Sequence, residues 1–254
     1  MPVSSHSIGE VIHRMDQIVE QCKRDQLRAG YFAVLYRFVT IRIKQGIENR
    51  EFDDNARMEK LDAIFAERFF DAFDGFYNGS GEPVTESWRH AFESAETSEY
   101  IIMQHLLLGI NAHINLDLGI AAAETMEGEP LELIRSDYDH VNAILSSLVD
   151  EVRNNISRVS MLFGPMIRLA DGKDEMLIDF SIVAARDGAW KFAHRYANAP
   201  DKALAIQQRD SKIASLARQL TNTGKWLTFL IRMIRYGEFR SPQANMKRLA
   251  GTVE

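Results

Sequence analysis

The chain has 254 residues, of which 46% are hydrophobic and 26% are charged, a composition typical of a soluble globular protein with a sizeable core. Its formal net charge of −6 argues against nucleic-acid binding, because duplex binders usually carry clustered Lys and Arg. Cys22 is the only cysteine, which excludes an intrachain disulfide and a site built from several thiolates. We expect this thiol to be exposed or half-buried and unreactive.

No targeting or membrane-spanning segment is recognisable. The N-terminal residues MPVSSHSIGEVIHRMDQ lack the basic and apolar regions of a secretory signal, and no apolar run reaches the roughly 20 residues that span a bilayer. We therefore expect a cytoplasmic protein without a transmembrane segment. Since no Pro/Gly/Ser-rich linker divides the sequence, residues 1–254 are expected to form one domain.

Apolar residues recur at spacings of three and four along the whole chain, and no hairpin signature interrupts them. The sequence therefore predicts an all-α bundle of about nine helices with one buried helix at its centre. Helices are expected at residues 6–28, 31–49, 54–76, 84–95, 98–125, 136–159, 173–198, 201–221 and 224–237.

The segment QHLLLGINAHINLDLGIAAAE, residues 104–124, combines an apolar helical pattern with many polar side chains. At about 100° per residue, these side chains form two stripes on nearly opposite sides of the helix. Because an unsatisfied buried polar group costs about 1–3 kcal/mol, both stripes need partners. The second stripe, made of carboxamides, is expected to bond neighbouring side chains or interrupted backbone. The first stripe contains His105, Gly109, His113, Asp117 and Glu124, and the second contains Gln104, Asn111 and Asn115.

His113 and Asp117 are the sharpest feature of this helix. They lie four residues apart, so an imidazole nitrogen and a carboxylate can face one ion, and Gly109 leaves room beside them. A single pair of this kind is common on helices and is usually just hydrogen-bonded. Because a catalytic zinc site takes three protein ligands, other helices must supply more.

Two further helices carry acidic and histidine residues on faces that are expected to point inward: Asp137 with His140, and Asp187 with His194. The three helices together predict a pocket for one or two divalent ions such as zinc, iron or manganese. The alternative is a set of buried His–Asp pairs without metal. In the metal-binding interpretation the ligands are His113, Asp117, His194 and His140, Asp137 or Asp187 positions a water or second ion, and His105 is an acid/base or further ligand.

Familiar catalytic signatures are missing from the sequence. The paired Glu-x-x-His motif of di-iron bundles, the adjacent His-Asp of helical phosphohydrolases, H-E-x-x-H, Walker-type glycine loops and G-x-S-x-G are all absent. These absences remove the best support for nucleotide binding and serine hydrolysis.

Three segments carry a resemblance to a known family: HLLLGINAHINLDLGIA, DYDHVNAILSSLVDEV and ARDGAW. Over most of its length the chain resembles a bacterial family that is known only as a domain of unknown function. The resemblance implies a single all-helical domain and no particular activity. A weaker similarity links the chain to all-helical zinc-dependent phospholipases and nucleases, but their N-terminal Trp ligand and secretory context are missing.

Three functions follow from these patterns. The first is a metal-dependent hydrolase acting on an unknown small molecule. The second is a non-catalytic scaffold whose buried His–Asp pairs fix the helix register. The third is a membrane-surface or lipid binder that uses the apolar and basic segment 225–240. Residues 225–254 are alternatively a docked terminal segment or an arm that forms a homodimer.

Overall fold

The structure is a computed structural model that describes residues 7–160, 182–222, 224–238 and 241–251, without the side chains at 149, 153 and 225–227. All regular elements in these ranges are helices, which confirms the all-α prediction for this part of the chain. In chain order they are α1 (Ile8–Asp25), α2 (Gly30–Glu48), α3 (Asn55–Phe73), the π turn η1 (Asp74–Asn78), α4 (Glu86–Glu96), α5 (Ile102–Ala112), the π turn η2 (His113–Asp117), α6 (Leu118–Thr125), the 3-10 turn η3 (Leu131–Ile134), α7 (Arg135–Val159), α10 (Ile182–Ala197), α11 (Lys202–Thr221), α12 (Lys225–Gly237) and α13 (Pro242–Leu249).

The predicted central helix is present as α5, η2 and α6, which follow one another without a break. This continuous helix contacts α2, α3, α4, α10 and α11. Contrary to the expectation from sequence, Ile102–Thr125 is long and apolar enough to meet the length and hydropathy of a membrane span. However, 89% of its most apolar stretch is buried within the protein, which is the behaviour of a core helix.

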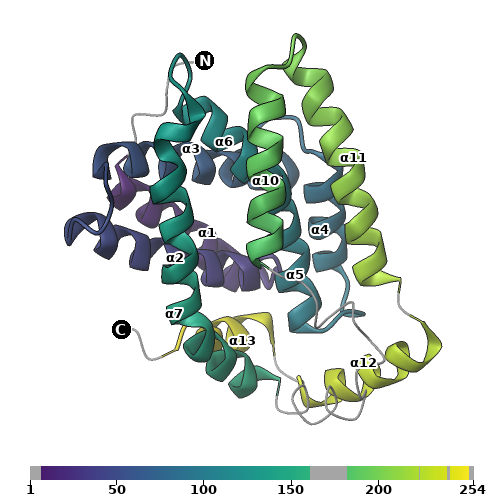
Figure 1. The fold of residues 1–254 in the computed structure, drawn as a ribbon. Helices are drawn as coiled ribbons and strands as arrows, with labels where there is room; N and C mark the ends of the chain where they lie inside the picture. The colour runs from purple at the N-terminus through teal and green to yellow at the C-terminus, as the bar shows by residue number, and fades with distance from the viewer. Residues whose placement is uncertain (1–6, 161–181, 223, 239–240, 252–254) are drawn as a thin grey trace.

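Most of the other described helices pack on this centre or on one another (Figure 1). α10 and α11 are joined by a short loop and lie side by side, with α10 on α6 and α11 on α4 and α5. α1 packs on α2, and α13 packs on α2 and α7. The close contact of α13 with α2 depends on Gly30, because a Cβ there would collide with Met246. Met246 is fully buried, so the C-terminal helix is part of the core.

Several local features differ from expectation. Cys22 is fully buried, and burial together with Asp25 raises the pKa of its thiol to about 12. The prediction of an exposed or half-buried thiol was therefore wrong. α13 was not foreseen, although Pro242 follows Ser241, whose hydroxyl caps the helix by accepting from the Ala244 N–H. Residues 173–181 of the helix expected at 173–198 lie outside the described residues.

The contact between α6 and α10 gives a stability prediction. A Cβ added at Gly119 would lie 2.6 Å from the Ala189 carbonyl oxygen, a backbone atom that cannot move aside cheaply. We expect Gly119→Ala to lower the free energy of unfolding by about 1–3 kcal/mol, because the two helices must separate. Denaturant unfolding followed by circular dichroism measures the change.

Gly188→Ala is the matched control, since the nearest atom to its added Cβ is the Arg209 Nη2 at 3.4 Å. The intrinsic preference of helices for Ala favours this variant by about 0.5–1 kcal/mol. Equal effects of the two substitutions would contradict the close approach of α6 and α10.

Candidate functional site

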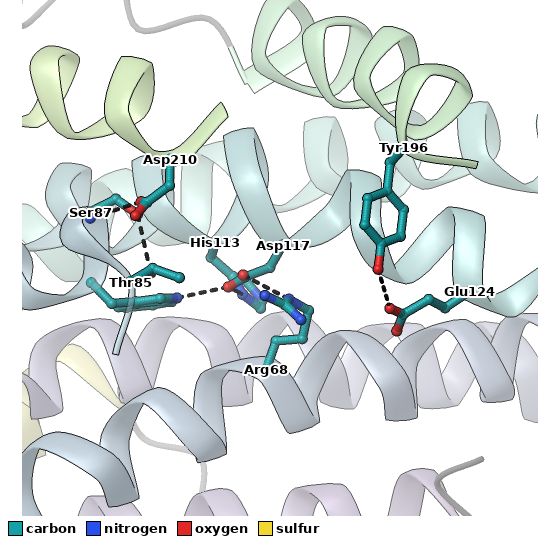
Figure 2. A network of polar contacts seen from close by, with 9 residues as sticks. Arg68, Thr85, Ser87, His113, Asp117, Glu124, Tyr196 and Asp210 are labelled. Carbon is teal, nitrogen blue, oxygen red and sulfur yellow. Dashed lines mark hydrogen bonds and ion pairs between the residues drawn. The ribbon is translucent and has the colours of Figure 1, made fainter. Parts of the chain in front are cut away.

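The Asp117 carboxylate is completely buried and joins three elements (Figure 2). Its Oδ1 accepts a hydrogen bond from the Arg68 Nε of α3 at 2.9 Å, and its Oδ2 accepts one from the Trp88 Nε1 of α4 at 2.8 Å. These charge-assisted bonds satisfy a group that would otherwise be costly to bury. Both oxygens are thus already used by protein donors.

His113 lies beside this carboxylate but does not bond to it. Its Nδ1 is 3.6 Å from the Asp117 Oδ2, beyond normal hydrogen-bond distance, and neither ring nitrogen has a partner among the described residues. The ring stacks on Phe65 with centroids 3.6 Å apart, and Tyr36 lies against it as well. Burial lowers the pKa of His113, while Asp117 opposes that shift, so the imidazole is neutral. Gly109 makes room for Phe32 rather than for an ion.

Asp137 is buried, as predicted, but it bonds backbone groups. Its two carboxylate oxygens accept from the N–H groups of Asp53 and Asp54, at 2.6 and 3.0 Å, just before α3 begins. Asp210 of α11 does the same at the start of α4, where it accepts from the backbone of Glu86 and Ser87 (Figure 2). Both aspartates therefore act as long-range caps of helix N-termini.

The other three predicted residues lie nearer the surface than expected. Asp187 is exposed, and the prediction that it faces inward was wrong. The His194 side chain is 43% exposed and its Nε2 lies 3.2 Å from a Glu132 carboxylate oxygen. The His140 side chain is 41% exposed and packs edge-on against Phe52.

The predicted residues are therefore not gathered at one point. Within the described residues, no group of three His, Cys, Asp or Glu side chains is arranged to hold one ion. Only His113 and Asp117 are brought together, and metal binding itself stays a prediction.

The carboxamide stripe is explained as expected. The Gln104 and Asn111 amides donate to the Leu220 and Ile213 carbonyls of α11, and Asn115 donates to Asn111.

A cavity with unmatched buried polar groups is lined by residues of α5, α12 and α13, among others. Its volume is about 450 Å³, within the range of small-molecule sites. We call it the His105 cavity. Its lining residues come from the α1–α2 and α4–α5 connections and from α2, α5, α12 and α13: Arg28, Tyr31, Ser98, Tyr100, Ile102, His105, Arg235, Glu238, Ser241 and Asn245.

His105 forms part of the buried wall of this cavity. Its side chain is packed between Tyr31 and Tyr100, with ring centroids 5.8 and 6.2 Å away, and the residue is only 5% exposed. Neither ring nitrogen has a hydrogen-bond partner of normal geometry in the described part of the chain. Burial and the positive charge of Arg28 lower the pKa of His105 to about 3, a shift that a backbone group of Tyr100 partly offsets. The imidazole therefore offers one donor and one acceptor to the cavity.

Glu238 provides the acidic group of the cavity. One carboxylate oxygen accepts from the Ile102 N–H at the start of α5, at 3.0 Å, while the other has no hydrogen bond of normal geometry within the described residues, although the Ser160 hydroxyl lies close enough to lower the pKa of the carboxyl group. Burial raises the pKa of Glu238 to about 7, against the opposing influence of Ser160, Ile102 and Arg235. At neutral pH this carboxyl group is present in both protonation states.

Asn245 and Tyr31 complete the polar wall. The Asn245 amide donates to the Tyr31 hydroxyl at 3.3 Å, and its own carbonyl oxygen is buried without a partner among the described residues. Arg28 and Arg235 are the cationic side chains of the lining. They make hydrogen bonds to the Ala95 carbonyl and the Ser98 hydroxyl but no ion pair within the described residues.

The sequence predicted only His105 of this group. Glu238, Arg28, Tyr31 and Asn245 were missed because they lie in connections or at helix ends, where no periodic pattern marks an inward side. The one signal available was an acidic residue, Glu238, directly after a strongly apolar helix.

Comparisons with known proteins give a family and no function. The sequence profile of the family of unknown function DUF5995 matches residues 8–223. No curated protein and no solved structure matches the chain.

The Asp117 network gives a prediction for stability. Asp117→Ala leaves the half-buried Arg68 guanidinium and the buried Trp88 indole N–H without their acceptor. We expect the free energy of unfolding to fall by about 3–5 kcal/mol, as measured by denaturant unfolding. Asp139→Ala is the control, because Asp139 pairs with Arg135 at the surface, where such a loss costs about 1 kcal/mol or less. A similar loss of unfolding free energy in both variants would contradict a special stabilising role of the buried Asp117 carboxylate.

His105 gives a prediction for the pH dependence of stability. Because the folded state holds this imidazole neutral, its contribution is unchanged above pH 6.5 and is lost as the pH falls below that value. A shift from 6.5 to about 3 costs the wild type about 2 kcal/mol between pH 7.5 and pH 5. We expect His105→Gln to remove that part of the slope, measured by unfolding at both pH values. His13→Gln, at an exposed position, should retain the wild-type slope.

Proposed function

The chain belongs to the family of unknown function DUF5995, which assigns no activity, and we propose that the His105 cavity is an acid–base active site for a small polar molecule. The proposal is supported chiefly by the unmatched polar atoms of His105, Glu238 and Asn245, all buried around one cavity. Each such atom costs about 1–3 kcal/mol unless it acquires a partner. A polar ligand would supply partners to all three.

Glu238 is the proposed proton acceptor. Proton transfer works best when the pKa of the catalytic group lies near the working pH, and burial brings the pKa of Glu238 to about 7. Its partnerless oxygen is available to a water or a substrate hydroxyl. The Ile102 N–H holds the other oxygen and thereby fixes the orientation of the carboxyl group.

His105 is the proposed hydrogen-bond donor to the reacting oxygen. Its lowered pKa makes it a weak base but keeps it a neutral donor, which suits stabilisation of negative charge that develops on a carbonyl or phosphoryl oxygen. Tyr31 and Tyr100 hold the ring from two sides. This arrangement needs no rotation of the imidazole during the reaction.

Hydrolysis is the reaction class that we propose first. Glu238 removes a proton from water as the water oxygen bonds to the electrophilic centre. The proton then passes to the leaving group as the scissile bond breaks, so the carboxylate is regenerated. A divalent ion such as zinc, iron or manganese, bound at His113 and Asp117 or elsewhere, remains an additional proposal that addition of chelator tests. The cytoplasmic location and the homodimer also remain proposals.

The experiment compares turnover of p-nitrophenyl acetate and p-nitrophenyl phosphate by the wild type and by Glu238→Gln. We expect the substitution to reduce kcat/KM by roughly 100-fold, the lower end of the usual contribution of general acid–base catalysis. His105→Gln should reduce kcat while leaving the pH dependence due to Glu238 in place. Glu124→Gln is the matched control, since Glu124 is a partly buried glutamate that bonds Tyr196 elsewhere (Figure 2).

The readouts separate the alternatives. Wild-type turnover that is lost in Glu238→Gln and kept in Glu124→Gln supports the proposal, and loss with chelator adds a metal to it. Equal turnover in all variants would place the chemistry outside this cavity. No turnover of either ester, together with no binding of any small polar probe, would favour the non-catalytic scaffold.

A further inference from the structure

We infer that the molecule bound in the His105 cavity carries an oxyanion, a carboxylate or phosphate group, which Arg28 and Arg235 hold from opposite segments of the chain. This inference rests on the proposed function and adds the charge of the ligand to it. Arg28 lies in the connection between α1 and α2, and Arg235 lies in the last turn of α12. The two side chains therefore approach one cavity from different elements.

The charges around the cavity support this choice. The titratable and charged groups that line it are Arg28, Tyr31, Tyr100, His105, Arg235 and Glu238. Two are permanent cations, and the lowered pKa of His105 and the raised pKa of Tyr31 keep these two groups neutral near pH 7. The only anionic charge is the partial one on Glu238, so the cavity is net positive although the chain as a whole carries −6.

Arg28 and Arg235 have guanidinium N–H groups that donate to no acceptor among the described residues. Arg28 donates to the Ala95 carbonyl at a long 3.5 Å, and Arg235 donates to the Ser98 hydroxyl at 3.2 Å. Neither forms an ion pair with a described carboxylate, so most of the five N–H donors of each guanidinium remain available. Guanidinium groups bind carboxylate and phosphate through paired hydrogen bonds, which makes an oxyanion the best match.

Helix termini add to the positive potential. The cavity is lined by Ile102 at the start of α5 and by Ser241, which caps the start of α13. Helix N-termini carry partial positive charge and favour anions. The buried, partnerless polar atoms of His105, Glu238 and Asn245 point to a ligand independently of these termini.

Glu238 explains how an anion is tolerated beside a carboxyl group. When it is protonated, Glu238 can donate a hydrogen bond to the oxyanion through the oxygen that has no partner within the described residues. An anion at this place therefore stabilises the protonated form. Binding at pH 7.5, where part of the population is ionised, should therefore take up a proton from the buffer, which Glu238 must release again before it acts as the proton acceptor in turnover.

The test is titration calorimetry of the full chain at pH 7.5 with two probes, inorganic phosphate and acetate, in two buffers of different ionisation enthalpy. We expect binding of at least one probe, with an apparent enthalpy that differs between buffers because of proton uptake. Arg28→Gln and Arg235→Gln should each weaken binding by roughly tenfold, whereas Arg89→Gln, an exposed arginine on α4, should not. With acetate, which stays ionised at this pH, Glu238→Gln should abolish the buffer dependence, whereas phosphate exchanges protons of its own with the buffer.

The two probes distinguish the two sources of an oxyanion. Preference for phosphate indicates a phosphorylated ligand, and preference for acetate indicates a carboxylic acid. Should one arginine variant fail the folding check by circular dichroism, the other still carries the test. Absence of binding by both probes in the wild type, or equal binding in the arginine variants, overturns the inference. Turnover of the neutral ester p-nitrophenyl acetate would still leave the proposed function standing.

Discussion

Burial of the Asp117 carboxylate is the constraint on which the arrangement of the central helices depends. A carboxylate removed from water must be met by good donors, and here these come from Arg68 on α3 and the Trp88 indole on α4. The carboxylate itself lies at the end of the π turn η2, in the middle of the central helix. Three elements that are distant in sequence are therefore fixed relative to one another by a single side chain. The π turn changes the local helix geometry where the Asp117 carboxylate needs its donors. Such turns are often found at functional positions in helices.

Buried carboxylates also accept hydrogen bonds from backbone N–H groups where helices begin. Backbone N–H groups just before α3 and in the first turn of α4 have no partners within their own helices, and the carboxylates of Asp137 and Asp210 reach them from α7 and α11. A buried carboxylate and the unpaired N–H groups at the start of a helix thus provide hydrogen-bond partners for each other, although they are distant in sequence. This use of aspartate explains why acidic residues on inward faces do not form a shared site. Their lone pairs are occupied by backbone donors from α3 and α4.

The sequence predicts the helices and the central position of 104–124 because apolar periodicity is a local property. It also indicates that Gln104 and Asn111 need partners, and α11 provides them. It cannot identify the partner of Asp137, which lies 83 and 84 positions away. Nor can it show that the Asp117 carboxylate bonds Arg68 and Trp88 in place of His113, because those two residues lie 49 and 29 positions away. The partner of Glu238 cannot be predicted for a related reason. Its carboxylate bonds the Ile102 N–H of α5, which lies 136 positions away in the sequence.

The two buried polar clusters of this protein, one around Asp117 and one around His105, differ in their hydrogen bonding. Around Asp117 the carboxylate oxygens both have donors and thereby join the central helices, although the ring nitrogens of the neighbouring His113 lack hydrogen-bond partners within the described residues. Around His105 the polar atoms of three buried residues lack partners, and they surround a space large enough for a small molecule. Each of these atoms costs about 1–3 kcal/mol unless it acquires a partner, which is large against a net stability of about 5–15 kcal/mol. Incomplete hydrogen bonding around a cavity, more than the presence of histidine and aspartate, is therefore the observation on which the proposed site rests.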